Sequence, residues 1–180
     1  MAEYIRVIAN IVSIVFVTYG IFVLRKWKKV ADKLNDLTYS ATDVARYIIL
    51  RCNQRGKTIS NLKLQKILYF VQAEFLVSQG KPCFRERIEA WDFGPVIPDV
   101  YHRYKVYGSA SIPSVRDENY CPFDREDKAL ADGIIDECAK YSASTLVEIT
   151  HRQAPWRTAY HQYSGAVISN ESIKSFFQEG

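Results

Sequence analysis

The sequence contains few of the residues that build metal centres, disulfide frameworks or catalytic sites. It has four cysteines and three histidines in 180 residues, and no two cysteines form a CxxC pair. This spacing argues against a zinc site or a redox motif and predicts buried, reduced thiols at Cys52, Cys83, Cys121 and Cys138. No GxSxG, HExxH, P-loop or dinucleotide-binding motif is present. The sequence therefore predicts a protein that is not an enzyme, with no catalytic residue, no metal and no cofactor.

An excess of one charge sign is also missing from most of the chain. The formal net charge is +4, and one short basic cluster, RKWKK at residues 25–29, supplies all of it. Residues 30–180 therefore sum to about zero, which is not the electrostatic footprint of a nucleic-acid-binding domain. A nucleic-acid partner is not expected, and a DNA-binding regulator of its own locus is kept only as an alternative from another functional class.

One long apolar run is present, at residues 7–24, and it contains no charged residue. A run of about 18 residues is at the short end of what spans a bilayer as a helix. The basic cluster follows the run, which is the reverse of a cleaved signal peptide and places the C-terminal side in the cytoplasm. The sequence thus predicts a single-pass membrane protein with a cytoplasmic domain, a buried core helix being the alternative. The expected divisions are an anchor with its basic flank (1–29), a connector (30–39) and a domain (40–180).

The pattern of apolar residues in the domain indicates helices. Ser40 is placed to cap the first helix, which ends near Gly56. Residues 59–80 follow with an apolar surface over most of the circumference, which is typical of a central helix. Further helices are expected after Asp124, over residues 142–150, from Pro155 and Trp156, and after Ser169 or Asn170. The expected fold is mainly α, a compact multi-helix domain with a small extended or β element, preceded by a single transmembrane helix.

Residues 80–108 carry the extended element and then a dense group of aromatic residues. Residues 80–94 read as extended, with Phe84, Ile88, Ala90, Trp91 and Phe93 as candidates to point inward. Gly94-Pro95 and Ile97-Pro98 forbid a continuous helix, so a turn is expected before a helix that runs from about Pro98 to Gly108. Aromatic residues make up 13% of the chain, and a surplus of tyrosine and tryptophan on one side favours a protein-binding surface.

Three sequence blocks carry a resemblance to a known family. They are ISNLKLQKILYFVQAEFL (59–76), IEAWDFGPVIPDVYHRYKVYG (88–108) and ITHRQAPW (149–156). The middle block is the most specific, because its Ala-Trp-x-x-Gly-Pro-Val-x-Pro-x-Val-Tyr pattern is improbable by chance. With the helix before them the blocks cover about residues 38–178, and this segment resembles the Panacea domain of SocA-like antitoxins from bacterial and phage toxin–antitoxin loci.

The resemblance implies a mainly helical antitoxin domain that neutralises a cognate protein toxin by direct contact and performs no catalysis. One relative acts as an adaptor that delivers its toxin to a protease, so a protease is a further partner to consider. The residues that match the family signature, and are therefore candidates for binding a partner, are Gln65, Lys66, Tyr69, Trp91, Phe93, Gly94, Pro95, Pro98, Tyr101, Tyr104, His151, Pro155 and Trp156. Among these, the glycine and the prolines are expected to serve the fold, and His151 is expected to cap the end of its helix.

The N-terminal apolar segment departs from the plain family domain and leaves two accounts open. In the first, residues 7–24 anchor the antitoxin in a membrane, where a membrane-directed toxin must be bound. In the second, residues 1–29 are themselves a membrane-acting toxin, fused to the domain that restrains it. The length of the run and its basic stop cluster favour the anchor.

Overall fold

A computed structural model describes residues 20, 23–27, 38–114, 117–162 and 165–179. The chain divides into two units, residues 1–37 and residues 38–180. In the first unit, residues 20 and 23–27 are described, and they are helical. Most of the predicted membrane segment at 7–24, and of the alternative fused toxin at 1–29, lies outside the described residues. Within the described ranges, no helix is both long enough and apolar enough to cross a bilayer.

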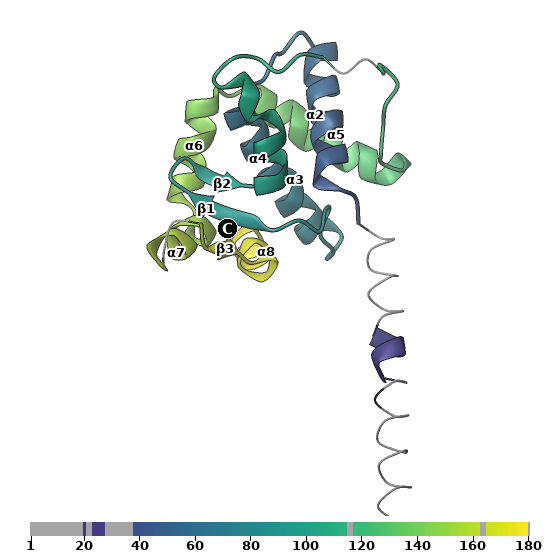
Figure 1. The fold of residues 1–180 in the computed structure, drawn as a ribbon, viewed down its shortest axis with the longest axis vertical. Helices are drawn as coiled ribbons and strands as arrows, with labels where there is room; N and C mark the ends of the chain where they lie inside the picture. Colours follow the sequence, from purple (N-terminus) through teal and green to yellow (C-terminus); the bar gives the residue numbers. More distant parts are fainter. Residues whose placement is uncertain (1–19, 21–22, 28–37, 115–116, 163–164, 180) are drawn as a thin grey trace, which may run out of the picture. The chain divides into compact units, whose positions relative to one another are not determined.

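The second unit is mainly helical with one small sheet, which confirms the predicted fold class of the domain (Figure 1). The helix expected from Pro98 to Gly108 changes its geometry after Tyr104, because a short 3-10 helix, η1 (Lys105–Tyr107), follows the α-helix α4 (Pro98–Tyr104). In chain order the elements are α2 (Ala41–Gln54), α3 (Asn61–Ser78), β1 (Ile88–Trp91), β2 (Gly94–Val96), α4 (Pro98–Tyr104), η1 (Lys105–Tyr107), α5 (Arg125–Ala139), α6 (Ala143–Arg152), α7 (Ala154–Gln162), β3 (Val167–Ile168) and α8 (Asn170–Glu179).

Side-chain caps fix where five of the helices in the described residues begin, and at α8 the cap is the Ser169 hydroxyl, which accepts a hydrogen bond from the backbone N–H of Ser172. The Ser40 hydroxyl accepts a hydrogen bond from the backbone N–H of Asp43, as the sequence predicts. Ser60, Asp124 and Ser142 accept equivalent bonds at the starts of α3, α5 and α6. Each of these bonds satisfies a donor that the first helical turn leaves without a partner.

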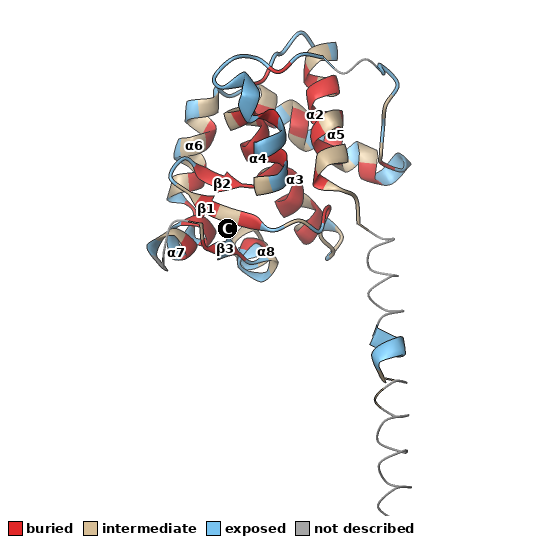
Figure 2. Cartoon of the chain, in the orientation of Figure 1, coloured by how far each residue is buried: buried red, intermediate tan, exposed pale blue. Residues whose placement is uncertain are grey.

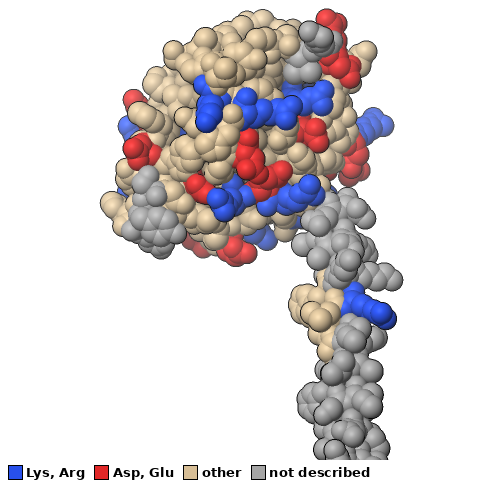
Figure 3. All heavy atoms as spheres, viewed as in Figure 1, with Lys and Arg blue, Asp and Glu red and all other residues tan. Residues whose placement is uncertain are grey.

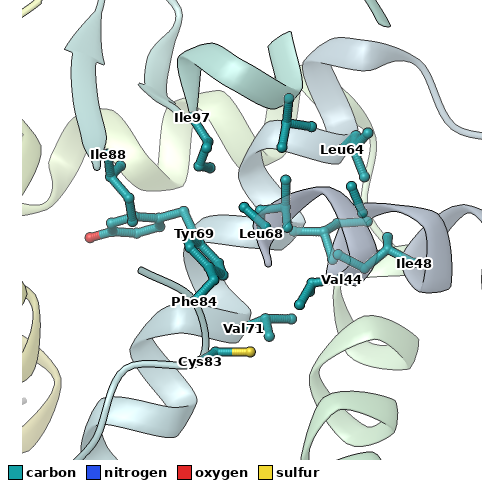
Figure 4. Close-up of a cluster of buried hydrophobic side chains, with 14 of the residues drawn as sticks. Val44, Ile48, Leu64, Leu68, Tyr69, Val71, Cys83, Phe84, Ile88 and Ile97 are labelled. Atoms are coloured by element: carbon teal, nitrogen blue, oxygen red, sulfur yellow. The ribbon is translucent and has the colours of Figure 1, made fainter. Parts of the chain in front are cut away.

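Helix α3 is the centre of the domain and packs against α2, α4, α5, α6, α8 and β2 (Figure 1). Figure 2 shows it buried along most of its length, in agreement with its apolar circumference. In the core, Val44 and Ile48 of α2 lie beside Leu64 and Leu68 of α3, and all four are fully buried (Figure 4). The apolar surface of α3 therefore fixes the position of every element that packs around it.

The sheet has the strand order β2-β1-β3, and both pairings are antiparallel. Trp91 pairs with Gly94, so Asp92 and Phe93 form a two-residue turn between β1 and β2. Helix α7 packs on β1, and α6 packs on β2. The turn that the sequence predicts around the Gly-Pro pair is therefore a tight hairpin between two short strands.

Two details of burial and one strand differ from the sequence-based expectations. Phe93 is 68% exposed, because it occupies the tip of the β1–β2 turn and not a strand position that faces the core. Cys121 is exposed in the segment before α5, whereas Cys52, Cys83 and Cys138 are buried as predicted. Strand β3 was not predicted, since two residues give too short a pattern to recognise.

Candidate functional site

The three sequence blocks, far apart along the chain, meet at the β1–β2 turn. Gln65 and Lys66 of α3 approach the turn from the interior. His151 of α6 and Trp156 of α7 contact the backbone of the turn from its other side.

Two amide side chains of α3 bind the backbone that follows the turn. Gln65 Oε1 accepts a hydrogen bond from the Ile97 N–H at 2.9 Å, and Gln65 Nε2 donates to Asn61 Oδ1 at 3.0 Å. Asn61 Nδ2 in turn donates to the carbonyl oxygen of Tyr101 at 3.1 Å. Both amides are almost completely buried, so these bonds are made away from competing water. They tie β2 and the start of α4 to the central helix.

Lys66 is a fully buried lysine beneath β2. Its Nζ donates to the carbonyl oxygen of Pro95 at 2.7 Å, and its side chain is 0% exposed. Burial removes water from the ammonium group and lowers the pKa of Lys66 from 10.5 to about 7. Near neutral pH the amine is therefore partly uncharged, which lessens the cost of placing it in the core.

Gly94 allows β2 to lie directly against this lysine. Its φ of +96° lies in the left-handed region. A Cβ atom at this position would lie 2.8 Å from Lys66 Cε and 2.8 Å from Thr150 Oγ1. Both the backbone conformation and the close approach require glycine here.

A stack of three rings holds the other side of the turn. The rings of His151 and Trp156 lie 4.0 Å apart, and those of Trp156 and Tyr160 lie 4.6 Å apart, all nearly parallel. Trp156 Nε1 donates to the carbonyl oxygen of Trp91 at 3.0 Å, and the Tyr160 hydroxyl donates to the Asp92 carboxylate at 3.1 Å. Helix α7 is thus bonded to the last residue of β1 and to the first residue of the turn.

His151 does not have the capping role that the sequence suggests. It lies within α6, with its ring stacked on Trp156, and its Nε2 is buried without a hydrogen-bond partner in the described part of the chain. Burial, and to a lesser extent the charge on Lys66, lowers the pKa of His151. A neutral stacked ring is favoured over the cation that a helix end would stabilise.

Between the turn and the α4–η1 segment lies a groove with a volume of ≈ 530 Å³. Its apolar side is made largely by Trp91 and Tyr101, whose rings pack edge to face at 4.9 Å. Phe93 projects from the tip of the turn along the same groove. The lining residues are Asn61, Leu62, Gln65, Trp91, Asp92, Phe93, Val96, Tyr101, Lys105, Gly108 and Ser109.

The structure divides the predicted signature residues into two groups. Gln65, Trp91, Phe93 and Tyr101 line the groove. The rest support it or lie in the core: Lys66, Gly94, Pro95, Tyr104, Pro155 and Trp156 are buried, Pro98 and His151 are half-buried, and Tyr69 is fully buried with its hydroxyl lacking a partner among the described residues.

The predicted site residues do not include seven residues that line the groove, namely Asn61, Leu62, Asp92, Val96, Lys105, Gly108 and Ser109. Asn61 lies four positions before Gln65 on one helix face, a spacing that could have suggested the pair. Lys105 carries no comparable signal, because its place depends on how η1 is positioned against α3 and β1.

The groove offers shape, aromatic surface and hydrogen-bond donors. In the described ranges no group of three His, Cys, Asp or Glu side chains is placed to hold a metal ion. A concave surface with aromatic walls and a few polar groups is typical of a binding site.

Comparison with known proteins places this sequence in a family. The sequence profile described as "Antitoxin SocA-like, Panacea domain" matches residues 64–157. The chain belongs to this family. The matched segment runs from Leu64, in the first turn of α3, to Arg157 in α7, so it includes the turn and most of the groups that hold it.

A curated relative of this SocA-like chain is Antitoxin SocA of Caulobacter vibrioides (strain NA1000 / CB15N). The two are 34% identical over 127 residues, which cover 64% of this chain and 68% of the relative. No solved structure gives a significant match.

Proposed function

We propose that this protein is an antitoxin that neutralises a cognate protein toxin by direct contact at the groove beside the β1–β2 turn. Membership of the SocA-like family supports the antitoxin role. The observation that carries the choice of surface is Phe93, a large aromatic side chain that is 68% exposed beside an apolar groove. Exposed aromatic residues next to a concavity are typical of protein interfaces.

The backbone around Phe93 is fixed before any partner arrives. Gln65, Lys66 and Trp156 each bond to the main chain of the hairpin or of the residue that follows it. A rigid turn loses little conformational entropy when it binds, so more of the contact energy remains as affinity. Lys66 and Trp156, which do not line the groove, therefore favour binding through the turn that they hold.

The DNA-binding alternative gains no support from the face of the domain drawn in Figure 3. Figure 3 shows Lys and Arg in a row on one face of the domain, with Asp and Glu close below them. A mixture of signs does not form the single-sign field that attracts a phosphate backbone.

Tethering to a membrane through residues 7–24 is part of the proposal and rests on the apolar run and its basic flank. We expect the full-length protein to sediment with membranes and to be released by detergent but not by high salt. A soluble full-length protein would contradict the anchor. Growth arrest caused by residues 1–29 expressed alone, and relieved by the domain, would favour the fused-toxin account.

The toxin-binding proposal is tested with the full-length protein and the small proteins encoded beside its gene. Each of these small proteins is expressed alone and together with this protein. One that arrests growth when expressed alone is then titrated into this protein by calorimetry. Phe93→Ser is expected to weaken that binding by at least about tenfold, since the loss of a central aromatic anchor commonly costs about 2 kcal/mol or more. Val167→Ser is the matched control, because Val167 is 54% exposed on β3 outside the groove.

Two results would refute the proposal. The antitoxin role fails if no toxic neighbour is relieved by this protein. The choice of surface fails if Phe93→Ser and Val167→Ser bind the toxin equally well.

A further inference from the structure

The floor of the groove is polar, although its walls are apolar. Asn61 and Gln65 line it, with 3% and 1% of their surface exposed. Each primary amide has two N–H donors, and each gives one of them to an acceptor in the described part of the chain, Tyr101 O for Asn61 and Asn61 Oδ1 for Gln65. The groove floor therefore has spare amide N–H capacity that an acceptor on a bound partner could use.

The rim of the groove adds a positive charge. Lys105 lines the groove and is exposed, and no described carboxylate forms an ion pair with its ammonium group. His102 and Arg103, also exposed, precede it on α4. The carboxylates nearby are those of Asp99, exposed on α4, and Asp92, which accepts the hydroxyl of Tyr160. The α4–η1 side of the groove therefore presents more positive than negative charge.

We propose that the groove recognises an apolar side chain next to an aspartate or glutamate on the toxin, with the apolar side chain against Trp91 and Tyr101 and the carboxylate between Lys105 and the amides of Asn61 and Gln65. This inference rests on the proposed function, because it names the chemistry of the toxin segment that the groove binds.

Complementarity of charge and hydrogen bonding selects this partner over others. A carboxylate accepts charge-assisted hydrogen bonds, which are stronger than those between neutral groups. A purely apolar segment would cover the amide floor and leave its spare donors without water or an acceptor, which costs affinity. A basic segment would be repelled by the positive charge of Lys105.

The test uses capped dipeptides as probes, so it does not require the toxin. The probes are N-acetyl-Leu-Glu-amide and N-acetyl-Phe-Glu-amide, each with its Gln counterpart as a neutral isostere. The full-length protein is labelled with ¹⁵N in its tryptophan indoles, and the chain has three tryptophans. Trp91 lines the groove, whereas Trp27 lies in the other unit and serves as an internal reference.

We expect saturable shifts of the Trp91 indole signal with the Glu probes, at dissociation constants on the order of 1 mM, which is typical of so small a contact. The Gln probes should bind about fivefold more weakly, the difference expected for one partly exposed ion pair. Lys105→Glu should abolish this preference for Glu over Gln. Arg125→Glu changes the net charge equally at an exposed position on α5, and it should leave the preference unchanged.

The outcomes separate this inference from the proposed function. Equal binding of Glu and Gln probes, or no shift of Trp91 at several times that concentration, would refute the carboxylate site. If the toxin loses affinity with Phe93→Ser but not with Lys105→Glu, the docking surface stands and the inference is wrong. If the Glu probes bind selectively while no neighbouring toxin binds, the site stands and the antitoxin proposal falls.

Discussion

Lys66→Met gives the sharpest test of the buried lysine that supports the turn. The pKa of Lys66 is lowered from 10.5 to about 7 by burial. Between these values the unfolded chain holds a proton on this lysine and the folded protein does not, so the unfolded state binds more protons. Stability must therefore rise with pH across this window, by up to about 1.4 kcal/mol per pH unit. Below the window both states are charged, and above it both are neutral.

The size of the effect follows from the same shift. From about pH 7 to pH 9 this lysine should contribute about 2 kcal/mol of added stability to the wild-type protein. Met fills similar volume without a charge, but it leaves the Pro95 carbonyl oxygen without its donor, at a cost of about 1–3 kcal/mol. The variant is thus expected to be more stable than wild type near pH 7 and to lose about 2 kcal/mol of that advantage by pH 9.

The assay is urea unfolding of both full-length proteins, followed by far-UV circular dichroism at several pH values between these limits. The difference between variant and wild type removes the contribution of groups that both share. Lys57→Met, which removes an exposed ammonium, controls for the change of side-chain type. A difference between Lys66→Met and wild type that stays constant with pH would refute the reasoning.

Three further predictions concern the turn and the thiols. Gly94→Ala should lower the free energy of unfolding in urea by about 2–4 kcal/mol, because residue 94 combines a positive φ with a close contact. Gly56→Ala should lower it by about 1 kcal/mol, because residue 56 has a positive φ but open space around it. Equal losses would contradict this reasoning. Trp156→Phe keeps an aromatic ring but loses the bond to the Trp91 carbonyl, so a loss of about 1–2 kcal/mol is expected, and an unchanged midpoint would count against that bond. A thiol reagent should label Cys121 rapidly in the folded protein, because this thiol is exposed. The other three thiols should react slowly, because burial raises their pKa. Fast labelling of more than one cysteine, identified by mass spectrometry, would be inconsistent with the fold.

The helices could be predicted because their signals are local. Ser40 and Asp124 cap the helices that the sequence assigns to them, and the apolar circumference of α3 identifies it as the central helix. The signature residues could be identified as a set for the same reason, since they form contiguous blocks.

What each signature residue does could not be predicted, because it depends on pairings across the chain. Lys66 and Pro95 are 29 residues apart, and Trp156 and Trp91 are 65 apart. Phe93 reads as an inward candidate because it is an apolar residue in a segment that reads as extended. The strand ends at Trp91, and Phe93 lies in the turn that follows, where the sequence pattern does not show which way a side chain points. Lys105 joins the groove only through the packing of η1.

The bonds that hold the β1–β2 turn have a consequence for how such a domain changes its specificity. Gln65, Lys66 and Trp156 all bond to backbone atoms of residues 91–97, and none of these bonds involves the side chain of Phe93. A substitution at the tip therefore leaves the support of the turn intact. At the tip, the exposed side chain and the bonds that hold the backbone belong to different residues, so under the proposed function a substitution at Phe93 could change the choice of toxin without first lowering stability.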